Sequence, residues 1–395
     1  MMPILEVTDL RCRYHSSAAA AVDGLSFTLE AGETIGLVGE SGSGKTTTAL
    51  GIMRLLGDRA TTTGTISYNS IDITGLSELE MDRLRWKDIA IVFQNSLEVL
   101  NPVMTVGKQV IEPLLKHTDM SPRGAEERCK ELFTSVGLDP VWMDAYPHHL
   151  SGGMRQRVLI AMALSCDPRV LILDEVTSAL DAVTRKELQD LLADLQKRRG
   201  YSMVLISHDL SFVSSLASRM IVLYAGRVVE CGPTRDIINT PRHPYTRGLV
   251  HSTPDIFIYK DLWGIPGEPP SENRYVGCPF QRRCIQAISI CSTTPPDLVP
   301  CGGGREIACH RGGIASLLRA DSLRYRYRLP DGRALQAIDD VNVEVSEGEV
   351  LALVGQTGSG KSTLAHILAG VLRPEVGEVR FMDKAVYGGD AGHRF

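Results

Sequence analysis

Two segments of this chain have the residue types and the spacing of a loop that binds phosphate groups. One runs from Gly39 to Thr46 and the other from Gly355 to Ser362, and both fit the pattern G-x-x-x-x-G-K-[ST]. Glycines let successive backbone N–H groups turn toward one point, and the following helix adds its positive N-terminal end. The residues predicted to bind nucleotide are Gly39, Ser41, Gly42, Ser43, Gly44, Lys45, Thr46 and Thr47 in the first loop and Gly355, Gly360, Lys361 and Ser362 in the second.

A pair of acids farther along the chain fits the first loop chemically. The apolar run 170–173 ends in Asp174 and Glu175. An aspartate at the carboxyl end of a strand can hold Mg²⁺ beside the phosphates, together with the Thr46 hydroxyl, while Lys45 reaches the β- and γ-phosphates. An adjacent glutamate can orient or deprotonate the attacking water. A plain acidic turn is the alternative, but with the loop upstream we favour hydrolysis of a nucleoside triphosphate.

Four shorter motifs follow the first loop in a set order. Leu150-Ser-Gly-Gly-Met-Arg-Gln-Arg157 would begin a helix capped by Ser151, with glycines that let the helix end approach a phosphate. Ser178-Ala-Leu-Asp181 follows the acid pair, Leu205-Ile-Ser-His-Asp209 comes later, and Gln94 follows Ile91-Val-Phe. Each alone fits a helix cap or a structural residue. Together, and in their order along the chain, the four motifs resemble those of ATP-binding cassette (ABC) ATPases. Leu150–Arg157 resembles the LSGGQ-type signature, Ser178–Asp181 the D-loop, His208 the switch histidine and Gln94 the Q-loop glutamine.

The resemblance implies a role for each residue. In ABC ATPases two nucleotide-binding domains face head to tail, and each ATP lies between one phosphate loop and the opposite signature. Glu175 would act on water, His208 would fix the γ-phosphate, and Gln94 would assist at Mg²⁺ with Thr46 and Asp174. Tyr14 would stack on adenine, although an ordinary strand tyrosine is the alternative. The remaining residues expected to bind nucleotide are Ser151, Gly152, Gly153 and Asp181, with Ser151 and Gly153 serving the opposite ATP.

A narrower resemblance covers residues 4–313. Ser96-Leu-Glu-Val-Leu-Asn-Pro-Val-Met-Thr-Val106, His243-Pro-Tyr-Thr-Arg-Gly-Leu249 and Gly277-Cys-Pro-Phe-Gln-Arg-Arg-Cys284 resemble segments of the ATPases of oligopeptide, dipeptide and nickel importers. The chain departs from that pattern at Val176, where proline is usual, and at His149, often glutamine. Neither change removes a catalytic group.

Five of the nine cysteines lie between residues 278 and 309. In a reducing compartment such a cluster indicates metal or redox chemistry, and four thiolates suit an iron–sulfur cluster or Zn²⁺. The spacing fits neither a paired CxxC zinc site nor a ferredoxin run. Resemblance to the importers implies a [4Fe–4S] cluster at Cys278, Cys284, Cys291 and Cys309, with Zn²⁺ or no metal as alternatives; Cys301 lies off the pattern.

The strands and helices that must position these residues are typical of an α/β fold. Apolar runs at 89–94, 170–174 and 203–207 predict parallel strands, and helical spacing predicts helices over 183–199, 106–117 and 122–136. The runs 25–39 and 341–355 are similar, at an offset of 316 residues, and each predicts an alternating strand, a Gly-Glu turn and a buried apolar strand entering the loop. From about 263 to 313 strand and helix patterns fade.

We therefore expect a complete ABC nucleotide-binding domain over 1–240, with a parallel-sheet core, antiparallel strands and a helical subdomain at about 95–150. A Cys-rich loop unit would span 241–313, and 314–395 would be the N-terminal part of a second ABC domain. No second Q-loop, signature, Asp-Glu pair or switch histidine follows Lys361 in this sequence. The expectation is that another copy or a separate cassette completes the site at Lys45.

The composition of the chain limits the classes of partner that we expect it to bind. The formal net charge is −5, which does not indicate nucleic-acid binding, and 43% of residues are hydrophobic, as in globular proteins. The N-terminus lacks the basic start and apolar core of a signal peptide, and the run 158–166 is too short to span a bilayer. We expect a peripheral ATPase at the cytoplasmic membrane face, working with two permease subunits and an external substrate-binding protein. A tandem ABC protein acting on ribosomes or DNA, or an incomplete product without a transport role, is the alternative.

Overall fold

The computed structural model describes residues 2–94, 99–178, 180–252, 265–268, 275–330, 332–347, 349–382 and 384–387. The start of the segment Ser96–Val106 lies outside the described residues. The chain divides into two compact units, Met1–Arg283 with Ile290–Cys309, and Cys284–Ser289 with His310–Phe395. Among the described residues, no helix has both the length and the apolar composition needed to cross a bilayer.

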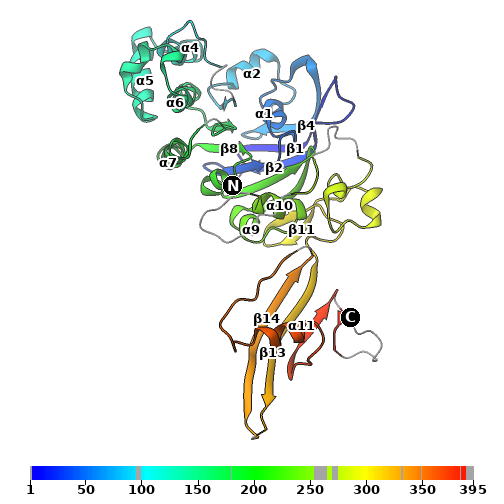
Figure 1. Ribbon diagram of the computed structural model, residues 1–395. Helices are drawn as coiled ribbons and strands as arrows, with labels where there is room; N and C mark the ends of the chain where they lie inside the picture. Colours follow the sequence, from blue (N-terminus) through cyan, green and yellow to red (C-terminus); the bar gives the residue numbers. More distant parts are fainter. Residues whose placement is uncertain are drawn as a thin grey trace. The chain divides into compact units, whose positions relative to one another are not determined.

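The first unit contains two sheets (Figure 1). An antiparallel sheet has the order β2-β1-β4-β5, and a larger sheet has the order β11-β12-β10-β9-β3-β8-β7-β6, of which β6, β7, β8, β3 and β9 are parallel. Their bounds are β1 Leu5–Tyr14, β2 Val22–Leu29, β3 Thr34–Val38, β4 Ala60–Tyr68, β5 Ile71–Asp72, β6 Ile89–Val92, β7 Val170–Asp174, β8 Ser202–Ser207, β9 Arg219–Tyr224, β10 Arg227–Pro233, β11 Val299–Gly302 and β12 Arg305–Ile307.

The pattern of burial follows from the two kinds of sheet. Every residue of β3, β7 and β8 is buried, as expected for inner parallel strands covered on both faces. In β1, by contrast, exposed positions alternate with buried ones such as Leu5 and Leu10 over most of its length. One apolar core joins residues of both sheets to the helix α1, so the helix that follows the phosphate loop is anchored in that core.

Helices surround the larger sheet. In the first unit they are α1 Lys45–Ile52, α2 Glu78–Leu84, α4 Val106–His117, α5 Pro122–Ser135, α6 Gly152–Ala163, α7 Ala182–Arg199, α8 Leu210–Leu216, α9 Thr234–Asn239 and α10 Pro244–His251. Short 3₁₀ turns are η1 Gly57–Arg59, η2 Pro140–Asp144, η3 Pro147–His149, η4 Gln281–Arg283 and η5 Ser289–Ser292. Helices α4, α5 and α6, which lie between β6 and β7 in the chain, pack on one another and gather at one end of the unit in Figure 1.

The Cys-rich segment is not only loop. Strands β11 and β12 pair with each other, and β12 pairs antiparallel with β10, so this segment extends the large sheet. No strand was predicted there, because the run Val299–Ile307 contains Pro300 and three consecutive glycines instead of alternating apolar residues.

The second unit repeats the start of the first. Its sheet has the order β14-β13-β15-β16, with the bounds β13 Ser316–Arg328, β14 Ala334–Ser346, β15 Val376–Phe381 and β16 Lys384–Ala385. The helix α11, Lys361–Leu368, lies between β14 and β15 in the chain. This order matches β2-β1-β4-β5, and α11 matches α1. The core is small: Ala320, Leu323, Ile338, Leu364, Ile367 and Val379.

One predicted strand of the second unit is wrong. Residues 350–354 form no strand, and Val350 and Val354 are exposed by 77% and 87%. The matching strand β3 is buried because it pairs with β8 on one side and β9 on the other. The described part of the second unit has no counterpart of either neighbour, so the apolar run lacks the hydrogen-bond partners that a parallel strand requires.

Candidate active site

The first phosphate loop joins the end of β3 to the start of α1. Its turn requires glycine, because a Cβ on Gly39 would lie 2.2 Å from the Leu223 carbonyl oxygen and one on Gly44 would lie 2.3 Å from that of Ala21. Both residues have positive φ, 153° and 102°. The buried Lys45 ammonium donates to the carbonyl oxygens of Gly39 (2.8 Å) and Glu40 (3.0 Å), so the loop closes around its own cation.

Asp174 provides a buried oxygen beside that loop. Its Oδ1 accepts a hydrogen bond from the Thr46 hydroxyl (3.2 Å), while Oδ2 is buried and has no hydrogen-bond partner among the described residues. Burial raises the pKa of Asp174 to about 6, partly offset by the Thr46 hydrogen bond. A carboxylate oxygen without a partner, next to a hydroxyl at a helix N-terminus, suits a divalent cation such as Mg²⁺. The predicted ligands Thr46 and Asp174 are thus together.

Glu175 links the loop to His208. One carboxylate oxygen lies 3.9 Å from the Lys45 ammonium, and the other lies 2.7 Å from Nδ1 of His208. The Glu175 backbone has φ of +50°, a left-handed conformation that costs a non-glycine residue about 1–2 kcal/mol, and its N–H donates to Ile206 O (2.8 Å). Strained backbone held in this way is common at sites of chemistry. Burial lowers the pKa of Lys45, and the charges of Glu175 and Asp174 oppose that shift.

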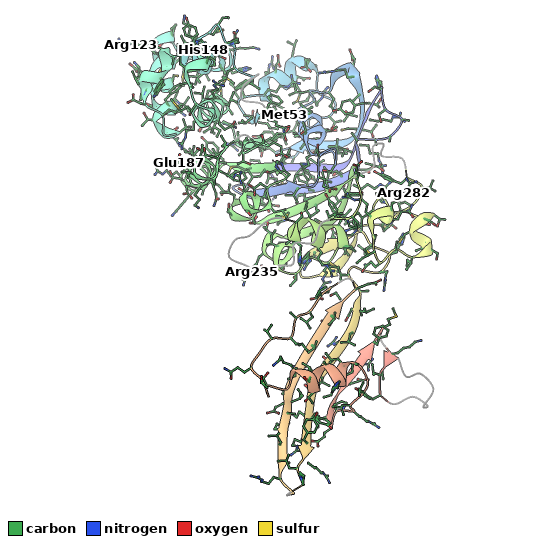
Figure 2. The ribbon with its side chains drawn as sticks, in the orientation of Figure 1. Met53, Arg123, His148, Glu187, Arg235 and Arg282 are labelled. Carbon is green, nitrogen blue, oxygen red and sulfur yellow. The ribbon has the colours of Figure 1, made fainter. Side chains whose placement is uncertain are left out.

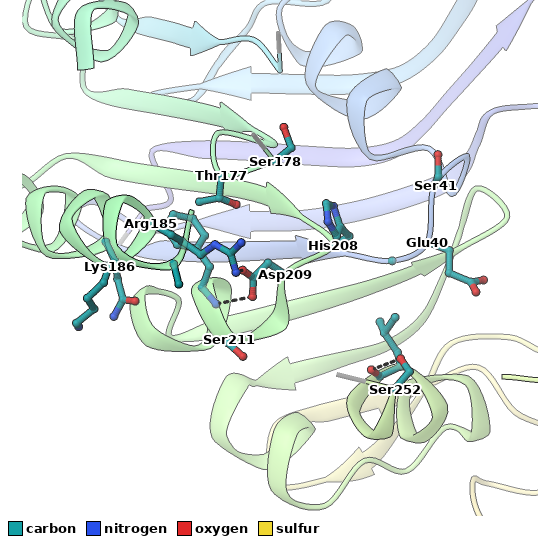
Figure 3. A pocket seen from close by; sticks show the side chains of 15 residues that line it. Glu40, Ser41, Thr177, Ser178, Arg185, Lys186, His208, Asp209, Ser211 and Ser252 are labelled. Carbon is teal, nitrogen blue, oxygen red and sulfur yellow. Dashed lines mark hydrogen bonds and ion pairs between the residues drawn. The ribbon is translucent and has the colours of Figure 1, made fainter. Parts of the chain in front are cut away.

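A cavity of about 810 Å³ borders the loop residues Gly39, Glu40 and Ser41 and also His208 (Figure 3). Arg185 at the start of α7 forms an ion pair with Asp209 (3.0 Å), drawn as a dashed line in Figure 3. The cavity therefore has hydroxyl, imidazole and guanidinium groups on its walls and is open to a large polar ligand.

Other predicted residues have separate positions. The Tyr14 hydroxyl lies 3.3 Å from that of Thr47 in α1, so Tyr14 is beside the phosphate-loop helix; its contact with adenine stays a prediction. Gln94, two residues beyond β6, has an exposed side chain. No contact between Gln94 and Asp174 or Thr46 supports its predicted place at Mg²⁺, which also stays a prediction.

The signature residues begin α6. Ser151 caps this helix by accepting the N–H of Met154 (3.2 Å), as its sequence position predicts. A Cβ on Gly153 would lie 2.5 Å from Thr184 of α7, whereas Gly152 faces open space. Asp181 caps α7 through the N–H groups of Val183 and Thr184. Ser151, Gly152 and Gly153 do not line the cavity next to Gly39–Ser41, and their role toward the opposite nucleotide stays a prediction.

The second loop has the local geometry of the first without its acidic neighbours. Lys361 donates to the carbonyl oxygens of Gly355 (2.8 Å) and Gln356 (2.6 Å), and Tyr327 pairs with Thr363 (3.3 Å) as Tyr14 does with Thr47. Gly360 has φ of +90°, and Ser362 is exposed at the start of α11. The described residues place no acid in a position equivalent to Asp174 or Glu175 here.

Three of the four predicted cluster cysteines lie in the first unit, and Cys284 lies in the second. The Cys278 N–H donates to the Cys291 carbonyl oxygen (2.7 Å). Burial raises the pKa of Cys278 to about 11, and the nearby Cys291 and Cys309 add to the shift. Among the described residues, no three His, Cys, Asp or Glu side chains are arranged to hold a metal, so the structure gives no support to the predicted iron–sulfur cluster.

Sequence reasoning missed the residues that hold the loop from outside. Glu40, an unspecified position of the loop motif, is bound by Tyr245 of α10 and by Arg283 at the end of η4. Arg283 lies in the quoted Cys-rich motif, and a buried arginine requires an acid, but the chain separation of 243 residues conceals which one.

The fold and the site together define an ATPase of the ABC type. The ABC transporter family model matches residues 22–178 and 338–393, and the chain belongs to that family. The model of the oligopeptide/dipeptide transporter C-terminal region matches residues 229–291.

Comparison with individual proteins agrees with this family assignment. The chain is 41% identical to the oligopeptide transport ATP-binding protein OppD of Salmonella typhimurium, over 78% of this chain and 93% of that protein. It is 35% identical to OppD of Mycobacterium tuberculosis, over 97% of this chain and 69% of that protein. Among solved structures, a dimeric ATP-binding cassette in a post-hydrolysis state with ADP and phosphate superposes with a TM-score of 0.54 at 28% identity, covering 58% of this chain and 99% of that one.

Proposed function

We propose that this ATPase drives an importer of peptides, with dipeptides, oligopeptides or related nickel-type substrates as its cargo class. The observation that carries the proposal is the match of residues 229–291 to the C-terminal region of oligopeptide/dipeptide transporters. The relatives named for oligopeptide transport support the same assignment. The protein would act at the cytoplasmic membrane face with two permease subunits and an external binding protein.

In the proposed cycle, ATP binds between the loop Gly39–Thr46 and the signature of a facing cassette, supplied by a second copy or by another subunit. Lys45 leaves the carbonyl oxygens that now hold it and contacts the phosphates. Bound Mg²⁺, held by Thr46 and Asp174, would neutralise phosphate charge. Glu175 takes up a proton from the attacking water, and His208, already 2.7 Å from Glu175, fixes its carboxylate.

Closure of two cassettes on ATP and their reopening after hydrolysis would move the permeases. The helical group α4–α6, whose helices pack on one another and which includes the signature at the start of α6, would dock on a permease loop. The second unit would be the start of a further cassette; its sheet order and loop geometry support this.

A [4Fe–4S] cluster at Cys278, Cys284, Cys291 and Cys309 is part of the proposal. Its support is the resemblance of these four cysteine positions to those of the importer ATPases, together with the proximity of Cys278 to Cys291 and Cys309. The arrangement of these side chains in the structure does not fit a bound metal, and no step of the cycle depends on one. Iron and sulfide analysis with a visible spectrum of anaerobically purified protein tests it, and a colourless, iron-free sample overturns it.

The transport function is tested by reconstitution. The chain should co-purify with two co-expressed permease subunits, and vesicles containing that complex should take up labelled peptide only with ATP and the binding protein. Glu175→Gln should abolish uptake while the complex still assembles. Association with ribosomes instead of permeases, or ATP-independent uptake, contradicts the proposal.

A further inference from the structure

Glu40, the second residue of the first phosphate loop, is held at each of its polar groups. Its backbone N–H donates to the Tyr245 hydroxyl (2.8 Å), and its carbonyl oxygen accepts from the Lys45 ammonium (3.0 Å). Its carboxylate accepts two hydrogen bonds from Arg283, of 2.6 and 3.0 Å. Tyr245 and Arg283 follow Glu40 by 205 and 243 residues, so a distant segment determines the conformation of the loop.

Arg283 is itself fixed in place. Its side chain is 6% exposed, its Nε donates to the Pro266 carbonyl oxygen (2.8 Å), and its guanidinium carbon lies 5.7 Å from the centre of the Tyr224 ring. Burial acts to lower the pKa of the Arg283 guanidinium, but the hydrogen bonds and charges of Glu40 and Tyr224 together hold this pKa above its usual range. A guanidinium that binds a carboxylate through two parallel bonds fixes orientation as well as charge.

The charge of Glu40 makes this pair relevant to ATP. Glu40 follows Gly39 directly and borders the same cavity as Ser41 and His208. A carboxylate at that position repels a triphosphate unless a cation compensates it. Arg283 supplies the compensating charge through its two bonds to the Glu40 carboxylate, and the Glu40 carbonyl oxygen is one of the two that bind Lys45.

We propose that Arg283 is a positioning residue for ATP binding: by clamping and neutralising Glu40 it sets the affinity of the first phosphate loop without touching the nucleotide. The inference concerns the ATPase site of this chain and is independent of the transported substrate. It gives the Cys-rich segment a function in the ATPase reaction that does not depend on a metal.

The test is Arg283→Met, which keeps the length and apolar character of the side chain. Because the variant loses both hydrogen bonds to Glu40 and leaves its charge uncompensated, we expect a rise of about tenfold in the dissociation constant for trinitrophenyl-ATP and in KM for ATP. The turnover number should stay close to wild type, because Glu175 and His208 are unaltered. Adding Glu40→Gln to Arg283→Met should restore most of the affinity for trinitrophenyl-ATP, since the uncompensated charge is then absent. Arg283→Lys should bind trinitrophenyl-ATP with an affinity between those of wild type and Arg283→Met.

Two matched variants separate positioning from loss of stability. Arg305→Met breaks another buried ion pair of the same unit, Arg305 with Glu230, and should lower the melting temperature without changing nucleotide affinity. Arg282 is the exposed neighbour of Arg283 and is labelled in Figure 2. Arg282→Met should change neither the melting temperature nor the nucleotide affinity. The proposal is overturned if Arg283→Met binds trinitrophenyl-ATP like wild type, if Arg305→Met weakens binding equally, or if Glu40→Gln gives no recovery. Should Arg283→Met fail to fold, Arg283→Lys and the double variant decide by the same measurements.

Discussion

Asp174 should make the stability of the nucleotide-free protein depend on pH in an unusual direction. The carboxyl is 1% exposed and its pKa is raised to about 6, against an ordinary value of 3.8. The folded state therefore binds this proton more tightly than the unfolded state does. Its contribution to the free energy of unfolding is fully present below the unfolded pKa and is lost as the pH rises through the folded pKa.

The size of the effect follows from the shift. A difference of about two pKa units corresponds to at most about 3 kcal/mol, of which about 1.4 kcal/mol is regained when the pH falls from 7.5 to 5. Asp174→Asn removes the titrating group and keeps the shape. The variant should therefore be more stable than wild type at pH 7.5, and the two should approach each other at pH 5.

Urea unfolding in EDTA, without nucleotide, measures this difference. The three tryptophans are Trp86, Trp142 and Trp263, and the two that the structure describes, Trp86 and Trp142, lie in the first unit and report on its unfolding. Asp190→Asn, an exposed acid of α7, serves as the control and should follow wild type at both pH values. If wild type and Asp174→Asn respond equally to pH, the pKa of Asp174 is not raised and the argument for an unsatisfied cation ligand fails.

Three further outcomes are expected. Glu175→Gln should still bind ATP but lose about 10²–10⁴-fold in hydrolysis rate, measured by phosphate release, because it removes the general base; unchanged turnover would exclude that role. Ser151→Ala should destabilise α6 by about 1 kcal/mol, seen in urea unfolding, since it removes the N-cap of that helix, and Ser214→Ala on an exposed position of α8 is the comparison. Lys361→Met should leave ATP turnover unchanged, whereas Lys45→Met should abolish it, because only Lys45 has Asp174 and Glu175 nearby; a similar loss in both would assign hydrolysis to the second loop as well.

The parallel core was predictable because its signals are local. β7 has the predicted bounds, β8 begins one residue early at Ser202, and the helix α4 runs from Val106 to His117 as its apolar spacing indicates. The phosphate loop and the acid pair were also predictable, because a set spacing at a strand end places them at one edge of a sheet. Contact of His208 with Glu175 confirms that two separately identified motifs meet.

The predictions that failed or were missed concern structure that is determined by residues far apart in the sequence. The run Val350–Val354 has the composition of β3, but composition alone does not supply the two flanking strands that β3 uses. Likewise, the acid that Arg283 binds is set by the packing of η4 and α10 against the loop, and no periodicity in the sequence records that packing. Strands β11 and β12 were missed because their pairing with each other, and that of β12 with β10, outweighs weak intrinsic strand preference.

The exposed run Val350–Val354 has a practical consequence. Five consecutive residues of types common in strands, without charge or proline and with their backbone not engaged in a sheet, form the kind of segment that pairs with copies of itself. Purified chain should therefore self-associate increasingly with concentration through this segment. Concentration-dependent light scattering, relieved by a charged substitution such as Leu351→Lys, would locate the solubility limit of the protein outside its catalytic unit.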